Sequence, residues 1–183
     1  MEIKELEIKG AWIASSPIHK DDRGFFREWF RSDEFEEAIG HTFIVQQSNI
    51  SSSNRGVIRG IHYSRATGGQ GKWVTCVSGS IWDVVVDIRP SSPTFKKWTA
   101  VELSAERGDA LYISEGLGHG FVALEENSNI VYLLTSKYSP AEEFEINPFD
   151  LDLKIEWPLE NIILSNKDST APTLKEQFES RKL

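Results

Sequence analysis

The strongest constraint on the fold is a period of two in the middle of the chain. In KWVTCVSGSIWDVVVDIRP (residues 72–90), apolar residues recur at every second position, as they do on the two faces of a β-strand. The segment Ser78-Gly79-Ser80 has the composition of a turn, so the stretch predicts a hairpin. One face of its second strand would carry Trp82, Val84, Val86 and Ile88, and the other Ile81, Asp83, Val85 and Asp87.

Short apolar segments separated by Gly, Ser, Pro and Asn recur along the rest of the chain. They are TFIVQQSNI, KWTAVEL, DALYI, HGFVAL and NIVYLLTSKY, and their spacing is typical of a β-sandwich or barrel. Only SDEFEEAIG reads as a helix, beginning with a cap at Ser32 and ending at Gly40. The tail, about residues 169–183, predicts a second short helix after Pro172 or an extension. With 183 residues and no internal boundary, we expect one domain over residues 1–183.

Charge and cysteine content exclude several classes of protein. The formal net charge is −8 and the pI is near 5.1, so the field of the protein repels polyanions, and we expect neither a nucleic-acid nor a membrane partner. The single cysteine, Cys76, allows no disulfide framework. The N-terminal segment MEIKELEIKGAWI has neither a basic leader nor a long apolar run. These features predict a cytoplasmic location.

A small barrel can enclose a ligand, because side chains alternate between its inside and its outside. The candidates for chemistry are His62 in GIHY, His119 in EGLGHGF, and Tyr132, which shares a strand face with Ile130 and Leu134. Spacing alone leaves open which face is inside, and each of these residues could equally be structural. A metal site of the cupin kind needs an H-x-H pair, and no such pair surrounds His62, so a metal is the weaker interpretation.

Eight polar strings, in order along the chain, carry a resemblance to a known family. They are DDRGFFRE (21–28), QQSNIS (46–51), GVIRGIHY (56–63), QGKWV (70–74), DVVVDIRPSSPTF (83–95), SEGLGHGF (114–121), KYSPAEE (137–143) and LSNKD (164–168). Together they resemble the dTDP-4-dehydrorhamnose 3,5-epimerases, and the resemblance covers nearly the whole chain. It implies an all-β, cupin-type double-stranded β-helix (a jelly-roll barrel) with one or two short helices.

The resemblance also implies a reaction and its residues. The substrate would be a dTDP-4-keto-6-deoxy-hexose, epimerised at carbon 3, carbon 5 or both, with no cofactor and no metal. His62 matches the family's base, and Asp168 the aspartate that bonds its imidazole. Tyr132 matches the acid on the other face of the sugar. Lys72 matches the lysine near the keto oxygen, where a fixed cation stabilises developing charge.

Ten further positions match substrate-binding residues of the family. Arginines match the diphosphate ligands, amides and carboxylates match groups that face the nucleotide or sugar, and aromatic residues match walls of the base pocket. The ten are Arg23, Phe25, Glu28, Gln47, Asn49, Arg59, His119, Tyr138, Glu143 and Lys167. In several family members a partner's N-terminal strand completes the pocket, so the resemblance implies a homodimer in which MEIKELEIKGAWI can pair across the interface.

Several alternatives stay open at this point. The string HYSRATGG departs from the family's usual HYQ, and SEGLGHGF and KWVTCV resemble epimerases of unusual deoxysugars, some of which invert one carbon only. The final sugar could enter a surface polysaccharide or a glycosylated metabolite. The other candidates are a sugar-nucleotide 3,4-ketoisomerase, a catalytically silent nucleotide-sugar-binding module and, more distantly, a metal-dependent cupin oxygenase.

Overall fold

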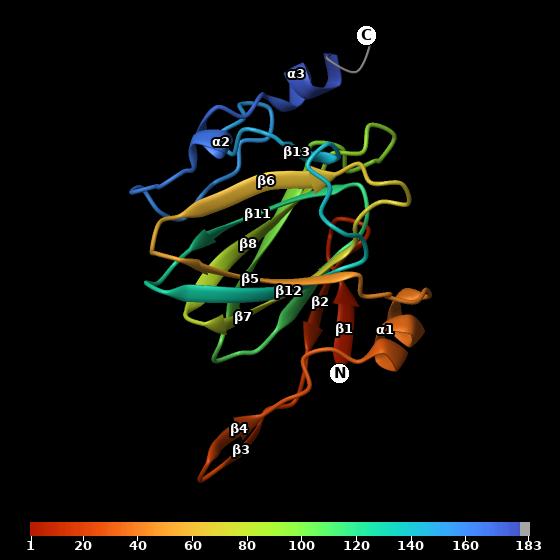
Figure 1. Ribbon diagram of the computed structural model, residues 1–183, viewed down its shortest axis with the longest axis vertical. Helices are drawn as coiled ribbons and strands as arrows, with labels where there is room; N and C mark the ends of the chain where they lie inside the picture. The colour runs from red at the N-terminus through yellow and green to blue at the C-terminus, as the bar shows by residue number, and fades with distance from the viewer. Residues whose placement is uncertain (180–183) are drawn as a thin grey trace.

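The computed structural model describes residues 1–179 and is built mainly of antiparallel strands in two stacked sheets (Figure 1). This confirms the predicted jelly-roll barrel. Three short helices lie outside the sheets, α1 near the N-terminal strands and α2 and α3 on the opposite side of the barrel (Figure 1). Within residues 1–179, no helix is both long and apolar enough to cross a membrane.

The two sheets are the frame of the molecule, and a separate two-stranded hairpin projects from it (Figure 1). The six-stranded sheet has the order β1 (Glu2–Glu5), β2 (Ala11–Ser15), β10 (Ala110–Ile113), β7 (Lys72–Ser78), β12 (Ser128–Leu134) and β5 (Gln47–Ser53). The five-stranded sheet has the order β13 (Glu143–Glu145), β6 (Ile58–Ser64), β11 (Leu117–Ala123), β8 (Ser80–Asp87) and β9 (Trp98–Ser104). The projecting hairpin consists of β3 (His19–Asp21) and β4 (Gly24–Phe26).

The predicted hairpin across Ser78-Gly79-Ser80 is wrong in its pairing. The chain does turn at Gly79, which has a φ of 68°, but β7 pairs with β10 and β12 while β8 pairs with β9 and β11. The turn therefore carries the chain from one sheet to the other. Alternation defines the two faces of a strand and leaves its neighbours unspecified, so the pattern could not distinguish a hairpin from this corner.

Both faces of β8 are covered, which explains its nearly continuous apolar sequence. Its inward residues Ile81 and Val85 pack between the sheets with Leu111, Leu117 and Ile130. Its outward residues pack under the C-terminal segment, in a cluster with Ile61, Ile146, Leu153 and Leu174. A third cluster, on the outer side of the six-stranded sheet, contains Phe35, Phe43, Trp73 and Tyr112.

Helices α1 and α3 lie where the sequence predicted helices, but the N-terminal cap of α1 differs from the prediction. Helix α1 (Ser32–Ile39) ends at Gly40, as predicted, where φ is 89°. Its N-cap is Arg31 and not Ser32, and no side chain caps it; the Arg31 guanidinium instead pairs with Asp33 at 2.6 Å. Helix α3 (Leu174–Glu179) confirms the predicted tail helix, and residues 180–183 of that prediction lie outside the described residues. Helix α2 (Asn166–Ser169) was not predicted from the sequence.

An irregularity in the pairing of β6 with β11 decides what faces the barrel interior. His62 pairs with His119 and Arg59 with Phe121, so β6 contains one residue more than its partner between these pairs. Residues three apart would normally lie on opposite faces of a strand, but this bulge lets Arg59 and His62 line the same cavity. Gly60 permits it, because its φ is 126° and a Cβ there would lie 2.5 Å from the Cα of Gly120.

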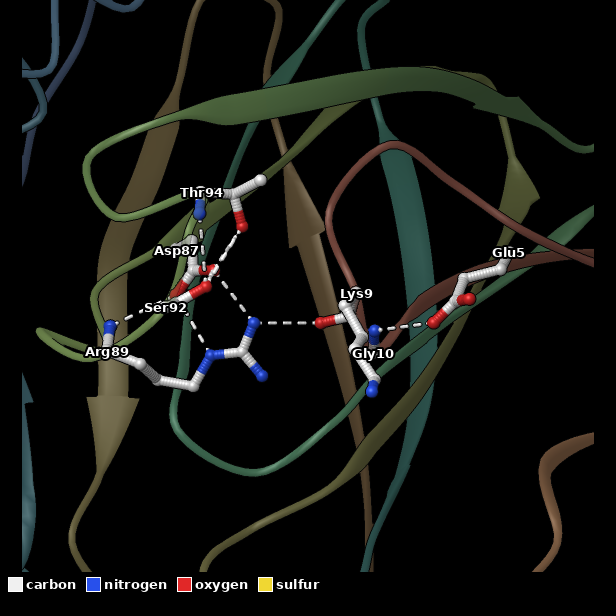
Figure 2. Close-up of polar contacts among 7 residues, drawn as sticks. All are labelled: Glu5, Lys9, Gly10, Asp87, Arg89, Ser92 and Thr94. Carbon is white, nitrogen blue, oxygen red and sulfur yellow. Dashed lines mark hydrogen bonds and ion pairs between the residues drawn. The ribbon is translucent and has the colours of Figure 1, made fainter.

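A buried carboxylate holds the far end of β8 to the N-terminal strands. Asp87 has no exposed surface and accepts hydrogen bonds from Arg89, Ser92 and Thr94, while Arg89 also donates to the carbonyl of Lys9 at 2.8 Å (Figure 2). Burial acts to raise the pKa of Asp87, but these donors outweigh it and hold the pKa well below its usual range. The charge is therefore part of the folded structure.

We expect Asp87→Asn to lower the free energy of unfolding by about 2–4 kcal/mol at pH 7, because it leaves the Arg89 guanidinium without its counter-charge. Because the pKa of Asp87 is lower in the folded than in the unfolded protein, the ionised carboxylate stabilises the fold at pH values above the unfolded-state pKa of about 3.9. This stabilisation is lost as the pH falls below that value and through the folded-state pKa. The deficit of the variant should therefore shrink below about pH 4. Urea unfolding at pH 7 and pH 3 measures this, with Asp152→Asn, which breaks an exposed pair with Lys96, as the control. An equal loss in the two variants would contradict the assignment.

Candidate active site

The interior of the barrel contains two cavities lined by polar residues. One cavity, of about 210 Å³, lies between the sheets, and a second, of about 190 Å³, shares His62, Lys72 and Tyr132 with it. The first is lined by Gln47, Asn49, His62, Gln70, Lys72, Tyr132, Leu134, Tyr138, Glu143, Phe144 and Lys167. The second is lined by Ser51, Arg59, His62, Lys72, His119, Phe121, Ile130 and Tyr132. The three shared residues make the two cavities one candidate site.

His62 on β6 is joined to Asp168 on α2 by a hydrogen bond of 2.6 Å from its Nε2. Ser165 caps α2, accepting from the Asp168 amide at 3.0 Å and donating to the second carboxylate oxygen at 2.9 Å. Burial acts to raise the pKa of Asp168, but the contacts with His62 and Ser165 lower it below its ordinary value. An ionised carboxylate can only accept, so Nε2 carries the proton and Nδ1 is the free ring nitrogen.

Tyr132 faces His62 from the opposite sheet. It lies on the inner face of β12 with Ile130 and Leu134, and it pairs in register with Asn49 on β5 and Val74 on β7. A molecule in the cavity therefore lies between an imidazole on one wall and a phenol on the other. This arrangement can remove a proton from one face of the molecule and supply a proton to the other face.

Lys72 is the buried cation of the site. It begins β7, and within residues 1–179 no ion pair or hydrogen bond involves its amine. Burial lowers the pKa of Lys72, while the charges of Glu143 and Asp83 oppose that shift. Because its donors are free, the amine can stabilise an oxygen that gains negative charge in the cavity.

His119 and Arg59 complete the wall that holds His62. His119 is buried, and its Nε2 bonds the Asp83 carboxylate at 2.8 Å. Arg59 donates to the Ser53 hydroxyl and to the Ser52 carbonyl, both at 3.0 Å, while its side chain lines the second cavity. The site thus contains two His–Asp pairs, whose histidines lie on the neighbouring strands β6 and β11.

Gln47, Tyr138 and Lys167, which are half-buried or exposed, lie at the mouth of the first cavity. Gln47 donates to Asn49 at 2.9 Å and accepts from the Tyr138 amide at 2.8 Å, which leaves the Tyr138 ring 60% exposed. Lys167 pairs at 3.0 Å with Glu145, next to Glu143 on β13. The structure therefore brings together eleven of the fourteen residues selected from the sequence: His62, Tyr132, Asp168, Lys72, Gln47, Asn49, Arg59, His119, Tyr138, Glu143 and Lys167.

The other three residues lie elsewhere in the same chain. Arg23 and Phe25 belong to the projecting β3–β4 hairpin, where Arg23 pairs with Asp21 at 2.5 Å and the Phe25 ring is 60% exposed. Glu28 follows the hairpin and lines a separate pocket with His19 and Arg31. The N-terminal strand β1 pairs with β2 of its own chain, and it forms an edge of the six-stranded sheet.

Sequence reasoning missed Asp83 as part of the site, along with Gln70, Ser51, Phe121 and Phe144. For Asp83 a signal was present, since it interrupts an otherwise apolar strand face between Ile81 and Val85. A carboxylate in such a position requires a buried partner, and that partner is His119. Within residues 1–179, no group of three or more His, Cys, Asp and Glu side chains is arranged to hold a metal ion.

Comparisons with known proteins agree with this geometry. The profile described as dTDP-4-dehydrorhamnose 3,5-epimerase matches residues 5–176. The chain is 48% identical to a dTDP-4-dehydro-6-deoxyglucose 3-epimerase of Streptomyces bikiniensis over 92% of this chain and 87% of the relative. It is 46% identical to a dTDP-4-dehydrorhamnose 3,5-epimerase of Mycolicibacterium smegmatis over 96% of this chain and 87% of the relative.

Solved structures show the same fold. The Mycobacterium tuberculosis rmlC epimerase superposes with a TM-score of 0.97 at 43% identity, covering 100% of this chain and 93% of the other. A 3'-monoepimerase from Streptomyces bikiniensis, solved in complex with dTDP-quinovose, has a TM-score of 0.93 at 46% identity, covering 97% and 90%. The chain therefore belongs to the dTDP-4-dehydrorhamnose 3,5-epimerase family and is an epimerase of dTDP-sugars.

Proposed function

We propose that the protein epimerises a dTDP-4-keto-6-deoxy-hexose at carbon 3, carbon 5 or both, by proton transfer through an enolate. The observation that carries this proposal is the placement of the His62–Asp168 pair and Tyr132 on opposite walls of one cavity. Inversion of a carbon requires a base and an acid on opposite faces of the sugar ring, and this arrangement supplies both.

The first step transfers a proton from the carbon beside the ketone to Nδ1 of His62. The electron pair left on this carbon forms a double bond to the carbonyl carbon. The carbonyl electrons move onto the ketone oxygen, which becomes the negatively charged oxygen of the enolate. Asp168 stabilises the resulting imidazolium, and the free ammonium of Lys72 stabilises the oxygen.

The second step returns a proton from the other wall. The Tyr132 hydroxyl donates its proton to the same carbon on the opposite face, the enolate collapses to the ketone, and the configuration is inverted. The enzyme then holds an imidazolium and a phenolate, and exchange of one proton through solvent resets both groups.

Arg59 supports recognition of the diphosphate. The protein carries a formal charge of −8, so an anionic substrate needs local cations, and a guanidinium presents paired donors to phosphate oxygens. Arg59 lies at the second cavity, beside His119, with its guanidinium fixed by Ser53 and Ser52. Tyr138, which is exposed at the mouth of the first cavity, would stack on the base.

We also propose a homodimer in which the β3–β4 hairpin crosses to the partner. The hairpin projects from its own barrel (Figure 1) and exposes Phe25 and Phe26 by 60% and 66%. Two exposed aromatic rings on one short hairpin favour a second surface that covers them. This crossing would bring Arg23, Phe25 and Glu28, three residues that their own cavity lacks, to the site of the other subunit.

His62→Ala tests the base. Turnover, and deuterium uptake from D₂O into dTDP-4-keto-6-deoxy-glucose followed by proton NMR, should both fall by about 10²–10⁴-fold, because no other group replaces the base. Binding of dTDP should stay within about twofold of the wild type, since the imidazole contributes to chemistry more than to affinity. Unchanged turnover would rule out His62. In the wild type, uptake at both carbons or at one carbon distinguishes a 3,5-epimerase from a monoepimerase.

Tyr132→Phe separates the two half-reactions. Proton removal by His62 should continue, so deuterium should enter the unreacted substrate without inversion, while formation of the epimer falls by about 10²-fold or more. The same NMR experiment records both quantities. If deuterium uptake is lost as completely as inversion, Tyr132 is not the acid.

Subunit complementation tests the crossed hairpin. Co-expression of His62→Ala with a chain carrying Arg23→Ala and Phe25→Ala produces mixed dimers, in which one site combines an intact His62 with an intact hairpin. The mixture should recover roughly one quarter of wild-type turnover, the fraction of intact sites in a random mixture of dimers. Each variant alone is the control and should remain impaired. No recovery from mixed dimers would show that the hairpin acts within its own chain or not at all.

A further inference from the structure

Lys72 differs from the other charged groups around the cavity, because it has no close partner. His62 bonds Asp168, His119 bonds Asp83, and Lys167 bonds Glu145. In the part of the chain that the structure describes, residues 1–179, the amine of Lys72 makes neither an ion pair nor a hydrogen bond. A buried ammonium without a counter-ion tends to lose its proton.

Asp83 is one source of compensating charge. Its side chain is fully buried on β8, and Oδ1 accepts from His119 at 2.8 Å. The other oxygen, Oδ2, is buried and has no hydrogen-bond partner within residues 1–179. Because no hydrogen bond from the described residues reaches this buried oxygen, its negative charge attracts cations in the cavity.

Glu143 is the other source. It lies on β13, at the edge of the sheet that contains β8, and lines the same cavity as Lys72. Gln70 donates to one of its oxygens at 3.3 Å, which fixes the carboxylate without neutralising it. Lys72 is on β7 of the opposite sheet, so both carboxylates act on it from across the barrel.

We propose that Glu143 and Asp83 are positioning residues that form a divided counter-ion for Lys72, keeping it protonated while leaving its three donors free. A direct ion pair would hold the charge but would also occupy the donors that the substrate's keto oxygen requires. This inference deepens the proposed function and rests on it. It assigns Glu143 a task other than contact with the substrate.

The direction of the titration agrees with this arrangement. Burial lowers the pKa of Lys72, and the charges of Glu143 and Asp83 act against that shift, so the protonated form persists to higher pH than burial alone would allow. The other titratable or charged groups that face the same space are His62 and Arg59 on β6, His119 on β11, Tyr132 on β12, Tyr138 between β12 and β13, and Lys167 on α2. Arg59 and Lys167 are cations, which favour loss of the Lys72 proton.

Direct titration of Lys72 tests the proposal without substrate. The protein is labelled with ¹³Cε,¹⁵Nζ-lysine, and Lys72→Met identifies the resonance. Glu143→Gln and Asp83→Asn should each lower the pKa of Lys72 by about one unit, and the double variant should lower it further. The control Glu142→Gln removes the same charge one residue earlier and should leave the pKa unchanged.

The pH profile of kcat provides the second measurement. In Glu143→Gln, the limb on which activity falls with rising pH should move to lower pH by the same amount as the Lys72 titration. A pH limb that stays in place, or no shift of the Lys72 titration in Glu143→Gln, would overturn the proposal. If Asp83→Asn does not fold, Glu143→Gln alone decides. If the titration shifts but the wild type epimerises no dTDP-4-keto-6-deoxy-hexose, the proposed function fails while the counter-ion assignment stands.

Discussion

The alternation of side chains along a strand is the constraint on which the rest of this structure depends. On β8 and β12, the same inner face carries residues of the apolar core and residues of the polar site. Ile81 and Asp83 share the inner face of β8, and Ile130 and Tyr132 share the inner face of β12. The chemical groups are therefore anchored on strands that the core already immobilises, and their positions follow from packing more than from loop conformation.

The two histidines inside the barrel are tolerated because each has a carboxylate partner from a different element. Asp168 comes from a helix after the last strand and reaches His62 on β6, and Ser165 fixes its second oxygen. Asp83 does the same for His119 within the sheet. Each carboxylate also determines which ring nitrogen of its histidine is left free. The same hydrogen bond that offsets the cost of burying the carboxylate therefore orients the imidazole toward the cavity.

Much of the fold was predictable from local patterns, and the parts that were not depend on long-range pairing. Most strands of the two sheets, α1 and α3 follow from alternation, Gly40 and Pro172, although residues 42–46 of the predicted segment TFIVQQSNI lie outside β5. The corner at Gly79 was predicted as a hairpin, because a strand pattern contains no information about its neighbours. Most of the site residues were selected through the family resemblance. Their convergence could not be derived from spacing, because Arg59 and His62 share a face only through the bulge at Gly60.

His62 leaves the ribosome well before Asp168, because 106 residues separate the two. The later strands of both sheets, from β7 to β13, are synthesised in that interval, so the two layers can pair while the imidazole still lacks its carboxylate. The order of synthesis therefore makes the His62–Asp168 pair one of the last parts of the site to be completed.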